Sequence, residues 1–357
     1  MPEYCPVQQE LEGLKAEIRT LAAHPERFDA LALKVFRVQF AHCRPYRAWC
    51  ESIGWTSAEL EKAVQFGDSA AVPHLPVQAF KYADVVTPAM IPGPSTLVFE
   101  TRGTTATRRG TAPGRHTVLD PELYGWSLLE GFRGAYGPPS DWCILALLPD
   151  YLERKNASLV HMVSMLHAES EHPEQGFFLR NTSDLLDRAS RVLSAGGRVM
   201  MLGVTHALLD LAAEMPELPQ IKSGQFIVVE TGGMKGRRKE LLRSEVHTLL
   251  QKGLPDARID SEYGMTEMLS QGWAQGGGKF VAPPWMRASV RRSDDPFTAQ
   301  QAGRTGGLNF IDLANLHSCA FLSTQDLGRV DAEGRFEVLG RFQDSEVRGC
   351  NLLTLDP

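Results

Sequence analysis

Apolar residues in the first 70 positions of the chain recur at helical spacing among Glu, Lys and Arg side chains. The spacing is clearest in three stretches, residues 7–23, 27–51 and 57–66. A period near 3.6 is typical of helices that bury one face, so this region is predicted to fold as helical hairpins. Pro73 and Pro76 mark the end of the helical pattern.

Beyond this point, short apolar runs alternate with helical patterns. Strands are predicted at residues 95–100, 142–148, 198–203 and 225–230, and helices near residues 182–194, 204–214 and 237–252. Such alternation is typical of an α/β fold with a largely parallel sheet flanked by helices. From Cys319 onward, short β-rich segments and turn residues predict hairpins and a small β-rich tail.

Length, composition and charge narrow the class of protein. A chain of 357 residues with 43% hydrophobic content can bury a large core. We expect a helical region at 1–70, an α/β core at 71–318 and a β-rich tail at 319–357. A net charge of −6 argues against nucleic acid as the main partner, because such binders carry a basic excess. No apolar run reaches the roughly 20 residues of a membrane span, and no signal peptide is evident, so we expect a cytoplasmic protein.

Residues 101–110 follow an apolar run and carry the features of a phosphate-binding loop. Glycines let the backbone approach a ligand closely, threonines offer hydroxyl donors, and arginines offer charge. The groups concerned are Thr101, Gly103, Thr104, Thr105, Thr107, Arg108, Arg109 and Gly110. The loop is neither a Walker A sequence nor a dinucleotide-binding glycine motif. Taken alone, it fits an ordinary surface turn about equally well.

Residues 261–267 supply further groups that an ATP site needs. Tyr263 beside Gly264 offers an aromatic face on which a purine can stack. Thr266 offers a hydroxyl for the α-phosphate, and Glu267 offers a carboxylate for Mg²⁺.

A third motif lies near the end of the chain. Asp326 is the kind of carboxylate that grips ribose hydroxyls, and Arg341 can join it or meet a phosphate. ATP and Mg²⁺ are therefore the expected cofactors.

In this order, the three motifs resemble those of the adenylate-forming superfamily of acyl-CoA synthetases, luciferases and related ligases. Residues 101–110 match the register of its phosphate loop without a gap, and residues 263–267 match its Tyr-Gly-x-Thr-Glu motif. Residues 326–329 and 340–344 match its ribose and hinge motifs. The resemblance implies activation of a carboxylic acid by Mg-ATP, with acyl-AMP and pyrophosphate as products.

Within the superfamily, the chain is most similar to the acyl-protein synthetases of bacterial luminescence, the LuxE type, and to their relatives beside phenylacetate-CoA ligase. Residues 76–81, 149–154 and 158–162 resemble the entry and acyl-pocket segments of that branch. The resemblance assigns an adenine-wrapping turn at Thr231, Gly232 and Gly233. His161 and His206 are candidates to face the acyl pocket. A histidine on an apolar helix is about as often a satisfied core residue.

The tail carries Cys350, with Arg348 two residues before it. Luminescence-type synthetases place an acyl-accepting cysteine near the C-terminus, so the resemblance implies this role for Cys350. A thiolate attacks an acyl adenylate readily, and a neighbouring cation favours the thiolate. The acyl group would then pass to a reductase or an acyl carrier protein. The mobile domain with a catalytic lysine, which follows the hinge in other members, is expected to be largely absent.

The loop departs from the family pattern at several positions, and Arg109 replaces its usual lysine. Arginine keeps the charge but turns a point charge into a planar fork. Two alternatives therefore stay open. In the first, an acyl- or aryl-CoA ligase of the phenylacetate type, coenzyme A is the acceptor and Cys350 is idle. In the second, the chain binds nucleotide as a scaffold without catalysis. The sequence leaves open the acid's chain length, its aromaticity and the oligomeric state.

Overall fold

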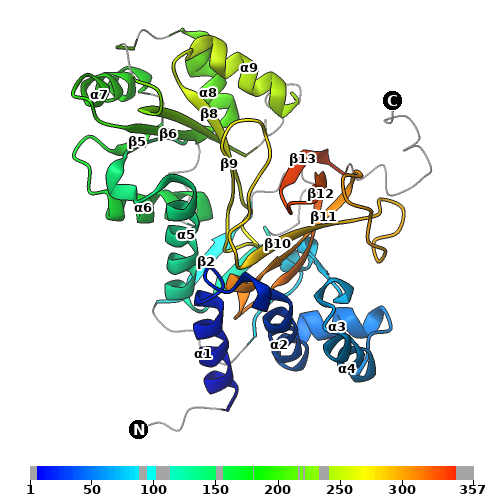
Figure 1. The fold of residues 1–357 in the computed structure, drawn as a ribbon. Helices are drawn as coiled ribbons and strands as arrows, with labels where there is room; N and C mark the ends of the chain where they lie inside the picture. Colours follow the sequence, from blue (N-terminus) through cyan, green and yellow to red (C-terminus); the bar gives the residue numbers. More distant parts are fainter. Residues whose placement is uncertain are drawn as a thin grey trace, which may run out of the picture.

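The N-terminal region folds as helices, as the apolar spacing predicts (Figure 1). Its α-helices are α1 (Pro6–Arg19), α2 (Phe28–His42), α3 (Arg44–Ser52) and α4 (Ser57–Phe66). Leu11, Leu14 and Ile18 lie on the buried face of α1. The computed structural model describes residues 6–87, 95–101, 113–149, 156–179, 181–215, 218–219, 222–232 and 241–342.

A six-stranded sheet in the described residues carries most of the predicted strands. Its order is β5 (Gly176–Phe178), β4 (Cys143–Leu147), β6 (Val199–Val204), β7 (Phe226–Thr231), β8 (Arg258–Tyr263) and β9 (Gly272–Ala274). Neighbouring strands are parallel, except that β9 runs antiparallel to β8. Every residue of β4, β6 and β7 is buried, as expected when helices cover both faces of a parallel sheet.

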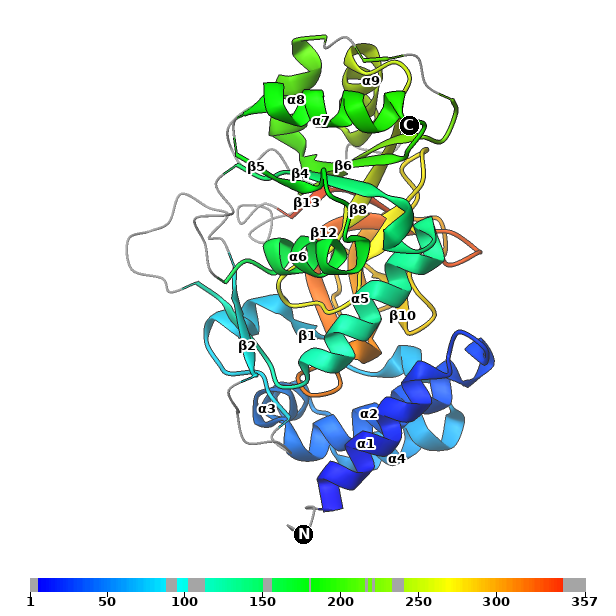
Figure 2. The same cartoon turned by 90° about the vertical axis from the view of Figure 1, so that its left-hand side faces the viewer.

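Helices lie on both faces of this sheet. Figure 2 shows α7 (Thr182–Ser194), α8 (Thr205–Ala213) and α9 (Arg243–Gly253) on one face, and α5 (Pro121–Tyr136) and α6 (Ser158–Ser170) on the other. The helix predicted at 182–194 is confirmed with the same bounds. Residues 237–240, where the last predicted helix was to begin, lie outside the described residues. No helix in the described part of the chain combines the length and apolar character needed to span a membrane.

The second large sheet contains the C-terminal strands. Its members are β1 (Leu75–Pro76), β12 (Phe321–Val330), β11 (Gly306–Asp312), β10 (Met286–Arg291) and β13 (Phe336–Arg341). The predicted tail hairpin is confirmed by β12 and β13, which pair antiparallel. At the turn between them, Gly334 has a φ of 78° and its N–H donates to the Asp331 carbonyl oxygen at 3.0 Å.

One predicted strand has a different partner from the one expected. The run at residues 95–100 forms β2 (Leu97–Glu100), but it is not part of the parallel sheet. It pairs antiparallel with β3 (Arg115–Val118) in a two-stranded sheet. An apolar run indicates a strand but not its neighbour, and β3 itself has too few apolar residues to be predicted from its pattern.

The N-terminal helices pack against the second sheet through Phe321. The ring centroids of Phe36 and Tyr46 lie 5.6 and 6.0 Å from that of Phe321. Gln39 on α2 is fully buried, and its side chain donates to the Asn315 carbonyl oxygen and accepts the N–H of Ala320, both at 2.9 Å. The contacts therefore fix the helices to the loop that precedes β12.

Candidate active site

The carboxyl ends of the parallel strands meet at one edge of the six-stranded sheet. The register pairs Val204, at the end of β6, with Thr231 at the end of β7. Thr231 in turn pairs with Glu262, next to Tyr263 at the end of β8. Ligands of open α/β sheets bind at this edge, because turns and helix N-termini gather there. The structure therefore brings the predicted residues Thr231, Gly232 and Tyr263 to an edge suited to a ligand.

Three predicted residues form a polar chain between the two large sheets. Tyr263 donates its hydroxyl to Asp326 Oδ2 at 2.8 Å. Arg341 Nε lies 3.2 Å from Asp326 Oδ1, since Asp326 on β12 and Arg341 on β13 are direct partners in the register. The Asp326 side chain keeps 13% of its surface exposed, so a ligand hydroxyl can still reach it. We call these residues the Tyr263–Asp326–Arg341 junction.

The ring of Tyr263 lies in an aromatic cluster. It stacks on Phe310 with centroids 5.4 Å apart, and the centroids of Phe336 and Phe280 lie 5.3 and 5.7 Å away. Because Phe310 covers one face of the ring, a stacked purine would have to use the opposite face. The predicted stacking on adenine stays a prediction.

Glu267 is a buried carboxyl group close to the junction. Its residue is 8% exposed, and burial raises its pKa to about 7. Arg341 and Lys81 favour its charged form from a distance. Among the described residues, however, no cation forms an ion pair with Glu267. A buried carboxylate without a cation is costly, and oxygen ligands suit Mg²⁺. Glu267 therefore fits the metal role predicted for it.

The ends of the predicted phosphate loop are held together by Thr101. Its N–H donates to the Gly114 carbonyl oxygen, and its hydroxyl accepts the N–H of Gly114, both at 2.8 Å. These contacts join the two ends of the β2–β3 connection. The remaining predicted loop residues, and two others, lie outside the described residues: Gly103, Thr104, Thr105, Thr107, Arg108, Arg109, Gly110, Gly233 and Cys350.

Two buried carboxylates at the strand edge were not identified from the sequence. Glu230 accepts hydrogen bonds from Ser261 at 2.6 Å and from Thr205 at 2.8 Å, and Arg243 Nε lies 3.1 Å from it. Burial opposes its charge, but His247, Arg243 and the two hydroxyls outweigh burial and lower its pKa. The sequence signal was a carboxylate at the carboxyl end of an otherwise apolar strand.

The second carboxylate is Glu262, on the neighbouring strand β8. It accepts a hydrogen bond from the hydroxyl of Thr231, a residue predicted to line adenine. Burial raises the pKa of Glu262 to about 7; the Thr231 bond opposes this rise and the charge of Glu230 adds to it. The strand edge thus holds one carboxyl group that is charged and another that is protonated up to neutral pH.

Of the two predicted acyl-pocket histidines, His206 is buried and His161 is half-buried. His161 on α6 lies with its ring centroid 5.5 Å from those of both Phe99 and Tyr124, and burial lowers its pKa. His206 is 5% exposed at the start of α8, directly after β6. Such positions suit a pocket wall and a core position equally, so the pocket role of both histidines stays a prediction.

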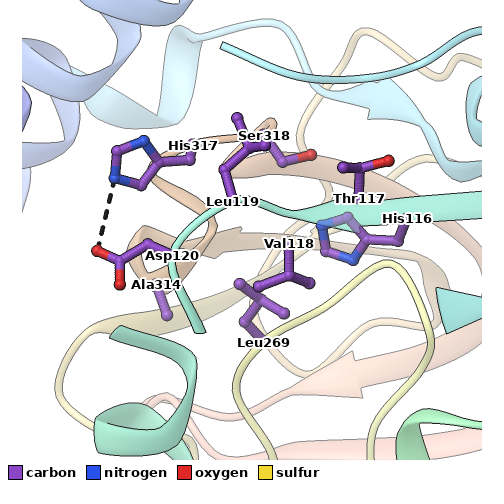
Figure 3. Close-up of a pocket in the computed structure, with 9 residues that line it drawn as sticks. All are labelled: His116, Thr117, Val118, Leu119, Asp120, Leu269, Ala314, His317 and Ser318. Atoms are coloured by element: carbon purple, nitrogen blue, oxygen red, sulfur yellow. Dashed lines mark ion pairs between the residues drawn. The ribbon is translucent and has the colours of Figure 1, made fainter. Parts of the chain in front are cut away.

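A small, partly open cavity borders Leu269, two residues beyond Glu267. Figure 3 shows His116 and His317 among the residues that line it. His317 Nε2 lies 3.7 Å from Asp120 Oδ2, and Lys15 Nζ lies 2.7 Å from the same oxygen. None of the predicted site residues lines this cavity, but through His116 and Leu269 it borders the segment that carries Thr266 and Glu267.

No protein-family model and no curated protein matches the chain, but its fold matches solved structures. A 2-hydroxyisobutyryl-CoA ligase, solved with 2-HIB-AMP and CoA, matches with a TM-score of 0.65 and 14% identity over 90% of this chain and 69% of its own. ATP-bound MatB from Rhodopseudomonas palustris matches with a TM-score of 0.49 and 17% identity, over 68% of this chain and 47% of its own. O-succinylbenzoate coenzyme A synthetase from Bacillus subtilis, in complex with AMP, matches with a TM-score of 0.47 and 18% identity. The match covers 68% of this chain and 49% of the synthetase.

The likeness to the 2-hydroxyisobutyryl-CoA ligase defines the class of fold. It extends over nine-tenths of the chain, and it confirms the predicted α/β fold with mixed and parallel sheets flanked by helices. The chain spans about half the length of the other two structures. At 14% identity the likeness is one of fold, so the luminescence-type branch stays a prediction.

Proposed function

We propose that the protein activates a carboxylic acid, with a fatty acid as the first expectation, and transfers the acyl group to a thiol. In the first step, a carboxylate oxygen of the acid attacks the α-phosphorus of ATP in line. The bond from this phosphorus to the leaving oxygen breaks, and acyl-AMP and pyrophosphate form. In the second step, a thiolate attacks the acyl carbonyl carbon, so that a thioester forms and AMP leaves.

The observation that carries this proposal is the Tyr263–Asp326–Arg341 junction at the strand edge. It offers a carboxylate and a cation in a fold shared with a CoA ligase. In the proposal, Asp326 and Arg341 hold the ribose, while Thr231, Gly232 and Gly233 line the adenine. Tyr263 holds Asp326 through its hydroxyl, and adenine would stack on the face of its ring opposite Phe310.

The phosphates and the metal are assigned to two segments of the chain. Thr266 contacts the α-phosphate, and residues 103–110, with Arg109 as their main charge, grip the β- and γ-phosphates. Glu267 holds Mg²⁺, which when bound neutralises charge on the phosphate oxygens. Catalysis by these residues is mainly positional and electrostatic.

The first half-reaction is tested by acid-dependent release of pyrophosphate from Mg-ATP, with a panel of fatty and aryl acids. Glu267→Gln should lower this rate at least about 100-fold, because the metal loses its charged ligand. Glu214→Gln makes the same change at an exposed position and should retain full rate. Full activity of Glu267→Gln would remove the metal assignment. Nucleotide binding without pyrophosphate release from the wild type would favour the scaffold alternative.

The acyl acceptor is tested by intact-protein mass after incubation with Mg-ATP and the acids, without coenzyme A. A hydroxylamine-sensitive acyl mass should map to Cys350 and disappear in Cys350→Ser, while pyrophosphate release continues. Cys5→Ser is the matched control at the other terminus. An adduct that persists in Cys350→Ser would show that this thiol is not the acceptor.

A second candidate is an acyl- or aryl-CoA ligase, and the fold match to a CoA ligase favours it. Coenzyme A would then be the acceptor and no reductase or carrier protein would be needed. Consumption of coenzyme A without a protein adduct distinguishes this reaction from transfer to Cys350.

A further inference from the structure

The peptide groups on both sides of Glu267 are held by buried side chains from other elements. His116, on β3, has its Nδ1 2.7 Å from the Thr266 carbonyl oxygen. Asn315, in the short turn η5 (Leu313–Asn315), donates its Nδ2 to the Glu267 carbonyl oxygen at 2.9 Å. Both side chains are fully buried, so these two bonds form away from water.

The residues that follow Glu267 are fixed in the same way. Asp312, at the end of β11, accepts the backbone N–H groups of Leu269 and Ser270 at 2.8 and 3.0 Å. Its other oxygen accepts the Ser270 hydroxyl at 2.6 Å. The segment from Thr266 to Ser270, in the loop between β8 and β9, is thus attached to β3, β11 and η5.

His116 makes its contact as a neutral donor. A carbonyl oxygen only accepts, so Nδ1 carries the hydrogen. Burial lowers the pKa of His116 to about 4, although the bond to Thr266 opposes this change. The ring packs edge-on against Phe80 with centroids 5.3 Å apart, which fixes its plane.

The other ring nitrogen of His116 indicates what the residue is for. Nε2 is buried and has no hydrogen-bond partner among the described residues. An apolar side chain would fill this space without leaving a buried nitrogen unsatisfied, which costs free energy. What the imidazole adds over an apolar side chain is therefore the bond from Nδ1 to Thr266.

We infer that His116 is a positioning residue that, together with Asn315, fixes the backbone of Thr266 and Glu267 and so directs the Glu267 carboxylate at a metal bound with ATP. This inference rests on the proposed role of Glu267. Groups that orient a metal ligand typically contribute 10- to 100-fold to metal affinity. His116 itself touches neither metal nor nucleotide in this arrangement.

Two substitutions at one position separate positioning from simple packing. In His116→Asn the side-chain amide N–H can occupy the place of Nδ1, whereas in His116→Gln it lies nearer the place of Nε2. The probe is Mn²⁺, whose free form is followed by electron paramagnetic resonance in the presence of a non-hydrolysable ATP analogue. Affinity for the analogue alone, in EDTA, is measured separately.

We expect His116→Gln to bind Mn²⁺ about 10- to 100-fold more weakly than the wild type, with unchanged affinity for the analogue in EDTA. His116→Asn should stay within about threefold of the wild type. Urea unfolding shows whether each variant is folded. Wild-type Mn²⁺ affinity in folded His116→Gln would overturn the inference, and so would equal losses in both variants.

Asn315→Leu tests the same inference if His116→Gln does not fold. Its Oδ1 has no partner among the described residues, so leucine removes one unsatisfied oxygen together with the bond to the Glu267 carbonyl oxygen. Weaker Mn²⁺ binding is again expected, and unchanged binding would count against the inference. If the wild type neither binds Mn²⁺ with nucleotide nor releases pyrophosphate, the proposed function fails and the inference falls with it. If pyrophosphate release and Mn²⁺ binding stay at the wild-type level in both His116→Gln and Asn315→Leu, the inference is overturned while the proposed function stands.

Discussion

Replacing the buried Glu262 by glutamine should stabilise the protein above pH 7. Glu262 is 6% exposed and accepts a hydrogen bond from Thr231. Burial raises its pKa to about 7 from an ordinary 4.5; the Thr231 bond opposes the rise, and the negative charge of Glu230 adds to it. The charged form of Glu262 is therefore unfavourable in the folded state.

The sign and size of the effect follow from the two pKa values. The unfolded chain loses this proton near pH 4.5, whereas the folded protein keeps it up to about pH 7. The folded state binds more protons in this window, so the free energy of unfolding falls as pH rises through it. The difference corresponds to about 3 kcal/mol once both states are ionised. Glutamine carries no charge, so Glu262→Gln should be about 3 kcal/mol more stable than the wild type at pH 8.5.

The assay is urea unfolding of the ligand-free protein at pH 5 and pH 8.5. At pH 5 the two proteins should differ by less than about 1 kcal/mol, because the folded state still carries the proton. Glu214→Gln, at an exposed position, should stay within about 0.5 kcal/mol of the wild type at both pH values. Equal or lower stability of Glu262→Gln at pH 8.5 would refute the reasoning, since the ionised carboxylate would then be adequately compensated.

Three further predictions concern other contacts of the site and its supports. Tyr263→Phe removes a hydrogen bond to the Asp326 carboxylate, of a kind that contributes about 1.5–3 kcal/mol. The KM for ATP in pyrophosphate release should therefore rise about tenfold or more. An unchanged KM would argue against the ribose assignment. In Asp312→Asn, an NH₂ group replaces one of the carboxylate oxygens that accept hydrogen bonds, so the free energy of unfolding should fall by about 3 kcal/mol. A loss below about 1 kcal/mol in urea unfolding would contradict the hydrogen-bond pattern. Lys15→Met leaves the buried Asp120 carboxylate without its closest cation and should cost about 3 kcal/mol in the same measurement, whereas Lys15→Arg should retain most of the stability.

The candidate site was predictable where its chemistry is local in the sequence. The spacing of Tyr263, Thr266 and Glu267 is a single motif, and Asp326 was identified by its own motif. The sequence did not show that Tyr263 would donate directly to Asp326, because 63 residues separate them and the bond depends on how the two sheets meet. Nor could it show His116, whose contact with Thr266 crosses 150 positions and follows no recognisable spacing.

The sequence by itself determined which segments are helical or extended, because a repeating apolar face is a local property. Helix α7 has the predicted bounds for this reason. Only the tertiary structure decided that β2 pairs with β3, since a strand's partner depends on a remote segment. It also decided which carboxyl groups of the strand edge keep a proton. Glu230 and Glu262 are chemically alike, but Arg243 and His247 lie near the first, while the second is buried beside a negative charge.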